Sequence, residues 1–378
     1  MEQSMNKNYP KGLMTHPSVF AVEDEYQIMM LVEREVLISV TVNGETYYDH
    51  VCGVRRSNTE VHRIAVPRAE LDAAGCYTLE VSEIIERKPY CPDIEEPCCY
   101  EYPFYPLTKT EDIVLHHISD VHGRVEDAIA STKAADRKAD VLIFNGDIPN
   151  HCGNFTEMRT LLQVASAVGE GSIPCVSARG NHDCRGCYAE NYMDFLPNRH
   201  GLSYYTFRIG CIWGVVLDCG EDKVDGHAEY GPTLCCHAFR KMETEFLRNV
   251  SGYDHPDVKY RLVVCHTPFS YTGREPFDIE IALFTEWSTI LKERVKPHLM
   301  LCGHTHSVEV CEIGGRRDHK GQPCPMIIAG IPRIFKRDPS DEPCSGHISA
   351  SITLNPDSAE VVAKDNTGYV GFTATLAL

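Results

Sequence analysis

Five apolar segments in the second part of the chain each end in residues that can bind metal ions. The first segment, IVLHHISDVHG, begins like a buried strand and then presents Asp120 and His122, two residues apart. Side chains at alternate positions of an extended chain point the same way, so this pair can hold one ion. In open α/β sheets, ligands bind beyond the carboxyl ends of the strands. The pattern therefore favours an α/β fold in which five strand ends converge on one cleft.

The residues at these five strand ends belong to three chemical types: aspartate, asparagine and histidine. A single histidine after a strand is most often a hydrogen-bonded structural residue. Buried chargeable groups each need a partner, however, and a shared group of cations would satisfy the whole set at once. The set therefore predicts a metal site whose ligands are Asp120, His122, Asp147, Asn181, His266, His304 and His306.

The size and chemistry of this set predict two divalent or trivalent ions. Seven ligands are too many for one zinc ion, which takes about four. Mixed oxygen and nitrogen ligands suit manganese, iron or zinc, and they disfavour calcium and copper(I). A carboxylate can bridge two ions, and Asp147 is the natural candidate. Two ions about 3.5–4 Å apart form the usual clamp for displacement at phosphorus.

The periodicity of the chain changes near residue 108. Residues 1–108 contain several short alternating segments, including two that flank Asn43-Gly44, the dipeptide of a tight hairpin. This predicts a small all-β sandwich of immunoglobulin or fibronectin type, ending in a Pro- and Tyr-rich linker at 88–106. In residues 109–378, apolar strands alternate with helical segments such as 126–139, 155–169 and 285–295, which predicts an α/β domain.

The charge and apolar content of the chain exclude several classes of protein. The formal net charge of −18, from 36 basic and 54 acidic residues, argues against general binding to nucleic acids or anionic membranes. No segment reaches about 18 consecutive apolar residues, and the first 20 residues lack the apolar run of a secretory signal. We therefore expect no membrane association and a cytoplasmic location.

The 18 cysteines are then expected to be mainly reduced thiols. Two alternatives stay open. Cys91, Cys98 and Cys99 could bind zinc or form a bridge, and the C-x-x-C pair Cys184 and Cys187 could make a redox-sensitive lid instead of an ordinary loop.

The chain resembles the calcineurin-like metallophosphoesterase family over roughly residues 111–310. The resemblance implies a metallophosphatase-type β-sandwich flanked by helices (αββα). All five motifs of the family occur in the family's chain order: Asp120-Val121-His122, Gly146-Asp147, Gly180-Asn181-His182-Asp183, His266 and Gly303-His304-Thr305-His306.

The resemblance also implies a role for each of these residues. One ion would bind to Asp120, His122, Asp147 and His306, and the other to Asp147, Asn181, His266 and His304. His182 would lie near the substrate, with Asp183 orienting it. A hydroxide that bridges the ions would attack phosphorus, and His182 would assist the leaving group. Asn150 and His151 follow Asp147 closely and are candidates for substrate contact, and the loops 184–200 and 219–240 are expected to shape specificity.

A β region before such a domain is also similar to the purple acid phosphatases. Those enzymes carry a tyrosine three residues after the bridging aspartate, where this chain has Asn150, so a tyrosinate-bound ferric ion is not expected. The predicted function is hydrolysis of a small phosphorylated substrate, either a monoester or a diester. A non-catalytic metal-binding scaffold or a partner-binding protein with the same fold is the alternative. Nuclease activity is disfavoured because the chain is acidic and lacks a basic stripe.

Overall fold

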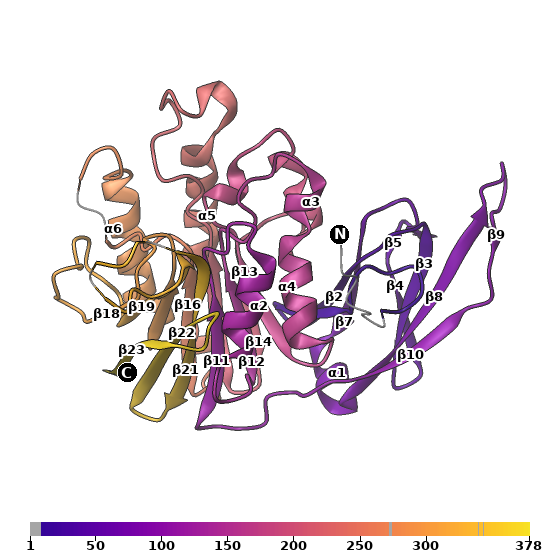
Figure 1. The fold of residues 1–378 in the computed structure, drawn as a ribbon, viewed down its shortest axis with the longest axis horizontal. Coiled ribbons are helices and arrows are strands. Elements are labelled where there is room, and N and C mark those ends of the chain that lie inside the picture. The colour runs from indigo at the N-terminus through magenta and orange to yellow at the C-terminus, as the bar shows by residue number, and fades with distance from the viewer. Residues whose placement is uncertain (1–8, 272–273, 339, 343) are drawn as a thin grey trace.

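The computed structural model describes residues 9–271, 274–338, 340–342 and 344–378. Residues 1–8, which contributed to the expectation of no secretory signal, lie outside this part of the chain. Two large β-sheets face each other at the centre, and helices cover their outer faces (Figure 1). In the described ranges, no helix is long and apolar enough to cross a membrane.

The first sheet contains the strands that precede the first three motifs. Strands β11 (Ile113–Ile118), β12 (Val141–Asn145) and β13 (Pro174–Ala178) pair in parallel in this order. Every residue of these strands is buried, which explains why their sequences are mostly continuous apolar runs. On the far side of β11 the sheet continues antiparallel with β21 (Ser345–Asn355), β22 (Ser358–Asp365) and β23 (Val370–Ala377), and β20 (Ile331–Arg333) pairs with β21.

The second sheet contains the strands that precede the last two motifs. Its order is β14-β15-β16-β17-β19-β18. The inner four strands are parallel, and the two edge strands pair antiparallel. The bounds are β14 Tyr205–Ile209, β15 Ile212–Leu217, β16 Tyr260–Cys265, β17 Leu299–Cys302, β18 Glu309–Cys311 and β19 Met326–Ile328.

The two sheets pack face to face around one core. Leu115 of β11 and Val264 of β16 both belong to this buried cluster. The first sheet is covered by α2 (Val125–Lys133), α3 (Phe155–Met158) and α4 (Thr160–Gly169), and the second by α5 (Cys236–Asn249) and α6 (Ile281–Ile290). The expected αββα sandwich is therefore confirmed.

The N-terminal strands continue the first sheet beyond β13. β1 (Ser18–Val22) pairs in parallel with β13, and β2 (Glu25–Leu31) and β7 (Val61–Pro67) follow outward. One sheet of the N-terminal sandwich is thus continuous with the α/β region, a long-range pairing that an alternation pattern does not predict. The β character of this region is confirmed, whereas the immunoglobulin type and the boundary at residue 108 stay predictions.

A smaller sheet of order β10-β8-β3-β4 packs on this extension through a shared core that includes Tyr26 and Leu79. It contains the hairpin predicted around Asn43-Gly44. The bounds are β3 Val36–Val42, β4 Glu45–Tyr48, α1 Arg68–Ala74, β8 Cys76–Glu86 and β10 Cys98–Pro103, with short strands β5 His50–Val51, β6 Val54–Arg55 and β9 Asp93–Ile94.

The expected linker at 88–106 is partly a strand. β10 pairs antiparallel with β8 from Cys98 to Pro103, and its proline lies at the strand end, where it does not interrupt the ladder. All 18 cysteines are free thiols. In the described chain, no cysteine belongs to a group of side chains placed to hold a metal ion.

Candidate metal centre

All seven predicted ligands lie at one edge of the two sheets. Each follows a strand end, and a chain of contacts of 4.0 Å or less links them through their side chains or, for His304, its backbone amide. The sheets therefore bring together residues from five separate motifs, as the convergence of strand ends predicts.

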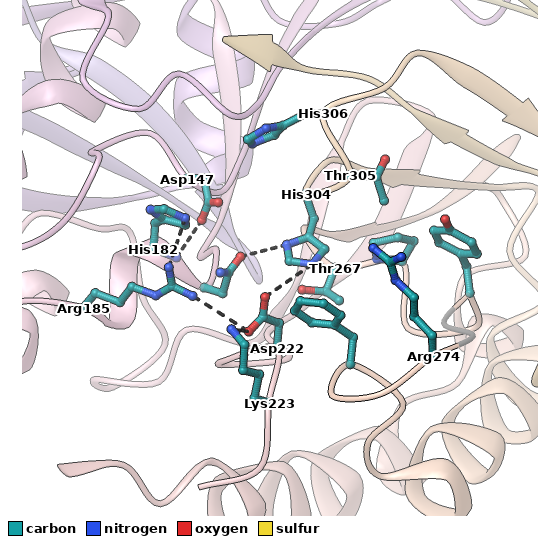
Figure 2. Close-up of a pocket in the computed structure, with 14 residues that line it drawn as sticks. Asp147, His182, Arg185, Asp222, Lys223, Thr267, Arg274, His304, Thr305 and His306 are labelled. Carbon is teal, nitrogen blue, oxygen red and sulfur yellow. Dashed lines mark hydrogen bonds and ion pairs between the residues drawn. The ribbon is translucent and has the colours of Figure 1, made fainter. Parts of the chain in front are cut away.

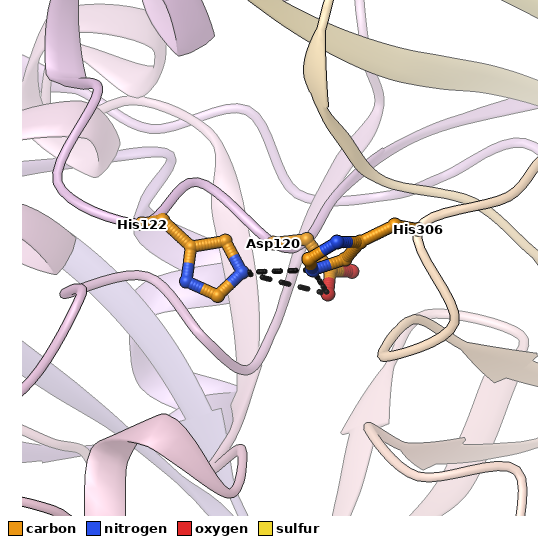
Figure 3. Close-up of side chains that lie close together, drawn as sticks. All are labelled: Asp120, His122 and His306. Atoms are coloured by element: carbon orange, nitrogen blue, oxygen red, sulfur yellow. Dashed lines mark hydrogen bonds and ion pairs between the residues drawn. The ribbon is translucent and has the colours of Figure 1, made fainter.

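The first group contains Asp120, His122 and His306 (Figure 3). Nε2 of His122 lies 3.0 Å from Nε2 of His306, and Nε2 of His306 lies 3.4 Å from Oδ1 of Asp120. Two imidazole nitrogens and a carboxylate oxygen thus face one another from the ends of β11 and β17. This donor set suits a cation of the manganese, iron or zinc type.

The second group contains Asp147, His266 and His304, with Asn181 beside them. Nδ1 of His266 lies 2.6 Å from the Asn145 carbonyl oxygen, to which it donates. Nε2 of His266 then faces Oδ2 of Asp147 at 3.2 Å, buried and without a hydrogen bond. An imidazole that donates one N–H to a carbonyl and leaves its other nitrogen free has the usual arrangement of a metal ligand. These residues therefore fit a bound cation.

Asp147 lies between the two groups. Its carboxylate is within reach of His122 and His182 on one side and of His266 and His304 on the other. Asn181 Oδ1 lies 2.9 Å from Nδ1 of His304. Because His304 belongs to the second group, Asn181 lies beside that group. This geometry agrees with a bridging position for Asp147.

The site contains buried negative charge that a bound cation would balance. The carboxylates of Asp120 and Asp147 are almost completely buried, and no lysine or arginine of the described chain pairs with either of them. Burial lowers the pKa of His266, but the carboxylates of Asp147 and Asp120 outweigh burial and raise that pKa to about 10. The two carboxylates therefore favour a positive charge at this position, and a bound ion would supply one.

The backbone at the site is strained. Positive φ angles, between 48° and 68°, occur at five of the candidate ligands: Asp120, His122, Asp147, His304 and His306. Non-glycine residues rarely adopt this region, although aspartate and histidine tolerate it better than most. Strain of this kind concentrates at functional sites, where the surrounding structure enforces it.

Two motif glycines allow the loops to approach closely. A Cβ atom at Gly180 would lie 2.3 Å from Oδ1 of Asp147, and one at Gly303 would lie 1.9 Å from Oγ of Ser119. Neither space admits a larger residue, so glycine is required where the loops after β13 and β17 pack against the first two motifs.

His182 is held by partners other than the expected one. Its backbone N–H donates to Oδ1 of Asp147 at 2.8 Å, its Nδ1 lies 2.9 Å from the Asn150 carbonyl oxygen, and its Nε2 lies 3.2 Å from Nη1 of Arg185. A carbonyl only accepts and a guanidinium only donates. His182 therefore carries its proton on Nδ1 and accepts at Nε2.

Asp183 does not contact the His182 ring in the described structure. Its Oδ2 accepts from the Gly180 N–H at 2.7 Å instead. Burial, and then the Asp147 carboxylate, raise the pKa of Asp183 well above its usual range. The two residues are neighbours in one 3₁₀ turn, His182–Cys184, whose successive side chains point in different directions. Asp183 thus braces the loop, and the orientation of His182 comes from Asn150 and Arg185.

Asn150 and His151 stay predictions as substrate contacts. The carbonyl of Asn150 positions His182, whereas Nδ1 of His151 accepts from the Gly153 N–H at 2.9 Å. Neither residue lines the pocket described next.

A pocket of about 430 Å³ opens beside the second group (Figure 2). Its lining includes residues that sequence reasoning missed, from three loops: Arg185, Asp222, Lys223, Tyr271, Arg274 and Phe277. The first three come from loops expected to shape specificity, but no motif marks them. The segment 271–277 has no periodic signal at all.

Two neighbouring carboxylates, Glu221 and Asp222, connect the two sides of this pocket. Glu221, which is fully buried, accepts from Nε and Nη2 of Arg185 at 2.5 and 2.9 Å. Asp222 contacts Lys223 at 3.0 Å and faces Nε2 of His304 at 3.9 Å. The pair therefore links the surroundings of His182 to those of His304, and Figure 2 shows the part of this link that involves Asp222.

Comparison with known proteins agrees with this geometry. A family model described as calcineurin-like phosphoesterase matches residues 113–308, just over half of the chain. A search of curated proteins gives no match.

One of the matching solved structures has a similar fold, and two others match more weakly. The structure of PhoD matches with a TM-score of 0.56 at 11% identity, covering 98% of this chain and 90% of that one. At this identity the likeness concerns the fold alone. A single mutant of Vps29 from Entamoeba histolytica matches with a TM-score of 0.33 at 11% identity, covering 70% of this chain and 99% of that one. The phosphopantetheinyl hydrolase PptH from Mycobacterium tuberculosis matches with a TM-score of 0.35 at 15% identity, covering 62% and 100%.

Proposed function

Because the chain belongs to the calcineurin-like phosphoesterase family, we propose that it is a metal-dependent hydrolase of phosphate esters. The observation that carries this proposal is the position of Asp147 between two groups of imidazole and carboxylate donors. Such paired groups are the usual basis for displacement at phosphorus.

The chain would hold two ions, manganese, iron or zinc, through the seven candidate ligands. Asp120, His122 and His306 would bind one, Asn181, His266 and His304 the other, and Asp147 both. When bound, the two ions neutralise the charge of the phosphate ester and acidify the attacking water. The strained loops hold these side chains in place before metal and substrate arrive.

His182 would assist departure of the leaving group. Nδ1 is engaged with the Asn150 carbonyl, so Nε2 is the ring nitrogen that can exchange a proton with a substrate in the pocket. Arg185 donates to this nitrogen in the present state. When the guanidinium turns to a phosphate oxygen, Nε2 can take up a proton and pass it to the leaving oxygen. General acid help of this kind contributes roughly 10²–10⁴-fold.

The test is an assay of the purified protein with manganese, iron or zinc against p-nitrophenyl phosphate and its bis ester, with metal analysis in parallel. We expect about two ions per chain and hydrolysis of at least one ester, lost on chelation and restored by metal. Two bound ions without any hydrolysis would favour the scaffold alternative. A scaffold is expected to lose ligand residues, and all seven are present here.

A further inference from the structure

The pocket beside the candidate metal groups extends beyond what cleavage of a phosphate ester requires. Its volume of about 430 Å³ lies within the range of sites that enclose a small organic ligand. Four of the candidate ligands and His182 line one end, and the other end is lined by Pro268, Tyr271, Arg274 and Phe277. The organic part of an ester cleaved at the metal end would therefore lie against the second end.

The three cations that line the pocket differ in how their charge is balanced. Glu221 neutralises Arg185, and Lys223 pairs with Asp222 at 3.0 Å and with Glu229 at 3.1 Å. Arg274 is exposed, and among the described residues its guanidinium has no hydrogen-bonded or ionic partner. In a chain with a net charge of −18, carboxylates for such a cation are plentiful, yet none in the described part of the chain forms an ion pair with this one. Figure 2 shows Arg274 on the opposite side of the pocket from Arg185 and Lys223.

Two aromatic residues near Arg274 in the sequence, Tyr271 and Phe277, also line the pocket. The Arg317 guanidinium stacks 4.1 Å from the centroid of the Tyr271 ring and is itself held by Glu309 at 2.9 Å. Nζ of Lys223 lies 5.0 Å from the centroid of the Phe277 ring. The two rings are thus held by cations, and their remaining surfaces offer apolar contact to an organic group. The far end of the pocket combines apolar walls with one uncompensated positive charge.

We propose that Arg274 is a specificity-determining residue that binds an anionic group on the organic part of the substrate. The substrate class is then a small phosphate ester whose apolar leaving group carries a second anion, a carboxylate or a phosphate. A guanidinium pairs with either group through two parallel hydrogen bonds. This inference rests on the proposed function, because it takes the reacting phosphate to lie at the candidate metal groups.

Four aryl phosphates with similar leaving phenols test the proposal. The neutral substrate is 4-ethylphenyl phosphate, the cationic one is tyramine phosphate, and the anionic ones are 3-(4-phosphonooxyphenyl)propanoate and 2-(4-phosphonooxyphenyl)ethyl phosphate. We expect the metal-loaded protein to prefer at least one anionic substrate over the neutral one by roughly tenfold in kcat/KM, the size of a charge-assisted hydrogen bond partly screened by solvent. The better anionic substrate identifies carboxylate or phosphate as the recognised group.

Variants assign this preference to one residue. Arg274→Ala should abolish the preference, and Arg274→Lys should retain part of it, because lysine keeps the charge but not the paired hydrogen bonds. Arg316→Ala is the matched control, since Arg316 has an 83% exposed side chain and does not line the pocket. It should leave the preference intact. Equal kcat/KM for anionic and neutral substrates, or an undiminished preference in Arg274→Ala, overturns the proposal.

A binding measurement separates this inference from the proposed function. Calorimetry with non-hydrolysable phosphonates, 4-ethylbenzylphosphonate and 3-[4-(phosphonomethyl)phenyl]propanoate, compares the same neutral and anionic groups without turnover. If the anionic compound binds more tightly, and this difference depends on Arg274, the subsite is supported. If no ester is hydrolysed at the same time, the proposed hydrolase function is rejected while the subsite stands. Equal affinity of both compounds would reject the subsite whether or not the esters are cleaved.

Discussion

Nε2 of His266 lies 3.2 Å from Oδ2 of Asp147, and both side chains are buried. These two residues come from different sheets, so their contact joins the end of β12 to the end of β16. Asp147 also accepts the backbone N–H of His182. One carboxylate therefore organises three loops as well as the two candidate metal groups.

Replacing Asp147 by asparagine should release metal. The neutral amide binds cations more weakly than a carboxylate, and it leaves His266 without the negative charge that it faces. We expect the metal content of Asp147→Asn to fall from about two ions per chain to one or none. Ester hydrolysis should be lost as well. Metal analysis and the p-nitrophenyl assay measure the two effects. Asp357→Asn, at an exposed position, is the control. Full metal occupancy in Asp147→Asn would contradict the bridging role.

Replacing Glu221 by glutamine should loosen Arg185. Glu221 is fully buried and holds both Nε and Nη2 of that guanidinium. Without this charge, Arg185 is no longer held where it can turn from His182 to a phosphate oxygen, so kcat should fall by roughly tenfold and the pH profile should change, while metal content stays the same. Steady-state kinetics over a range of pH measure both effects.

Glu229→Gln is the graded control for this prediction. Glu229 is 47% exposed and reaches Arg185 only at 4.0 Å, so its loss should have a much smaller effect on kcat. Equal effects of the two variants would show that the buried contact has no special role.

The buried carboxyl of Glu243 on α5 predicts a pH dependence of stability. Its Oε1 accepts from the Asp218 N–H at 2.8 Å, while Oε2 has no hydrogen bond. Burial, and then the Asp218 carboxylate, raise the pKa of Glu243 well above its usual 4.5. The folded protein retains a proton that the unfolded chain releases. Stability is therefore lost as pH rises from about 4.5, by up to about 1.4 kcal/mol per pH unit.

Glu243→Gln should remove this loss, because glutamine has the shape of the protonated side chain and does not titrate. We expect the variant to unfold at a higher temperature than the wild type at neutral pH. At acidic pH the unfolding temperatures of the two proteins should approach each other. Thermal unfolding followed by circular dichroism across this range measures the difference. A difference between the two proteins that does not vary with pH would show that Glu243 does not hold a proton in the folded state.

The positions of the candidate ligands could be predicted from the sequence because they depend on local rules. A buried strand followed by glycine and a chargeable residue places that residue at the sheet edge, as for Asp147 and His304. The side chains of Asp222 and Arg274 could not be placed in this way. They lie on loops whose course depends on tertiary contacts, such as the bond from Tyr230 to Asp222.

The same distinction holds for the fold. Strands β11, β12 and β13 were predicted from continuous apolar runs, but the parallel pairing of β1 with β13 joins residues about 155 apart in sequence. No local pattern encodes such a pairing. Asp183 shows the limit at atomic scale: its type and motif were recognised, but the 3₁₀ turn points its side chain to Gly180 and away from the His182 ring.

Replacing His182 by alanine should separate metal binding from turnover. Its ring contacts Asn150 and Arg185, and only its backbone N–H bonds to Asp147, a contact that alanine preserves. We therefore expect His182→Ala to bind about two ions, as wild type does, and to lose roughly 10²–10⁴-fold in kcat. Parallel metal analysis and kinetics measure the two properties, with His50→Ala, at an exposed position in the N-terminal region, as the control.

Because a missing general acid matters less for a better leaving group, the loss should be larger for phenyl phosphate than for p-nitrophenyl phosphate. Full activity, or an equal loss on both esters, would refute proton donation by His182.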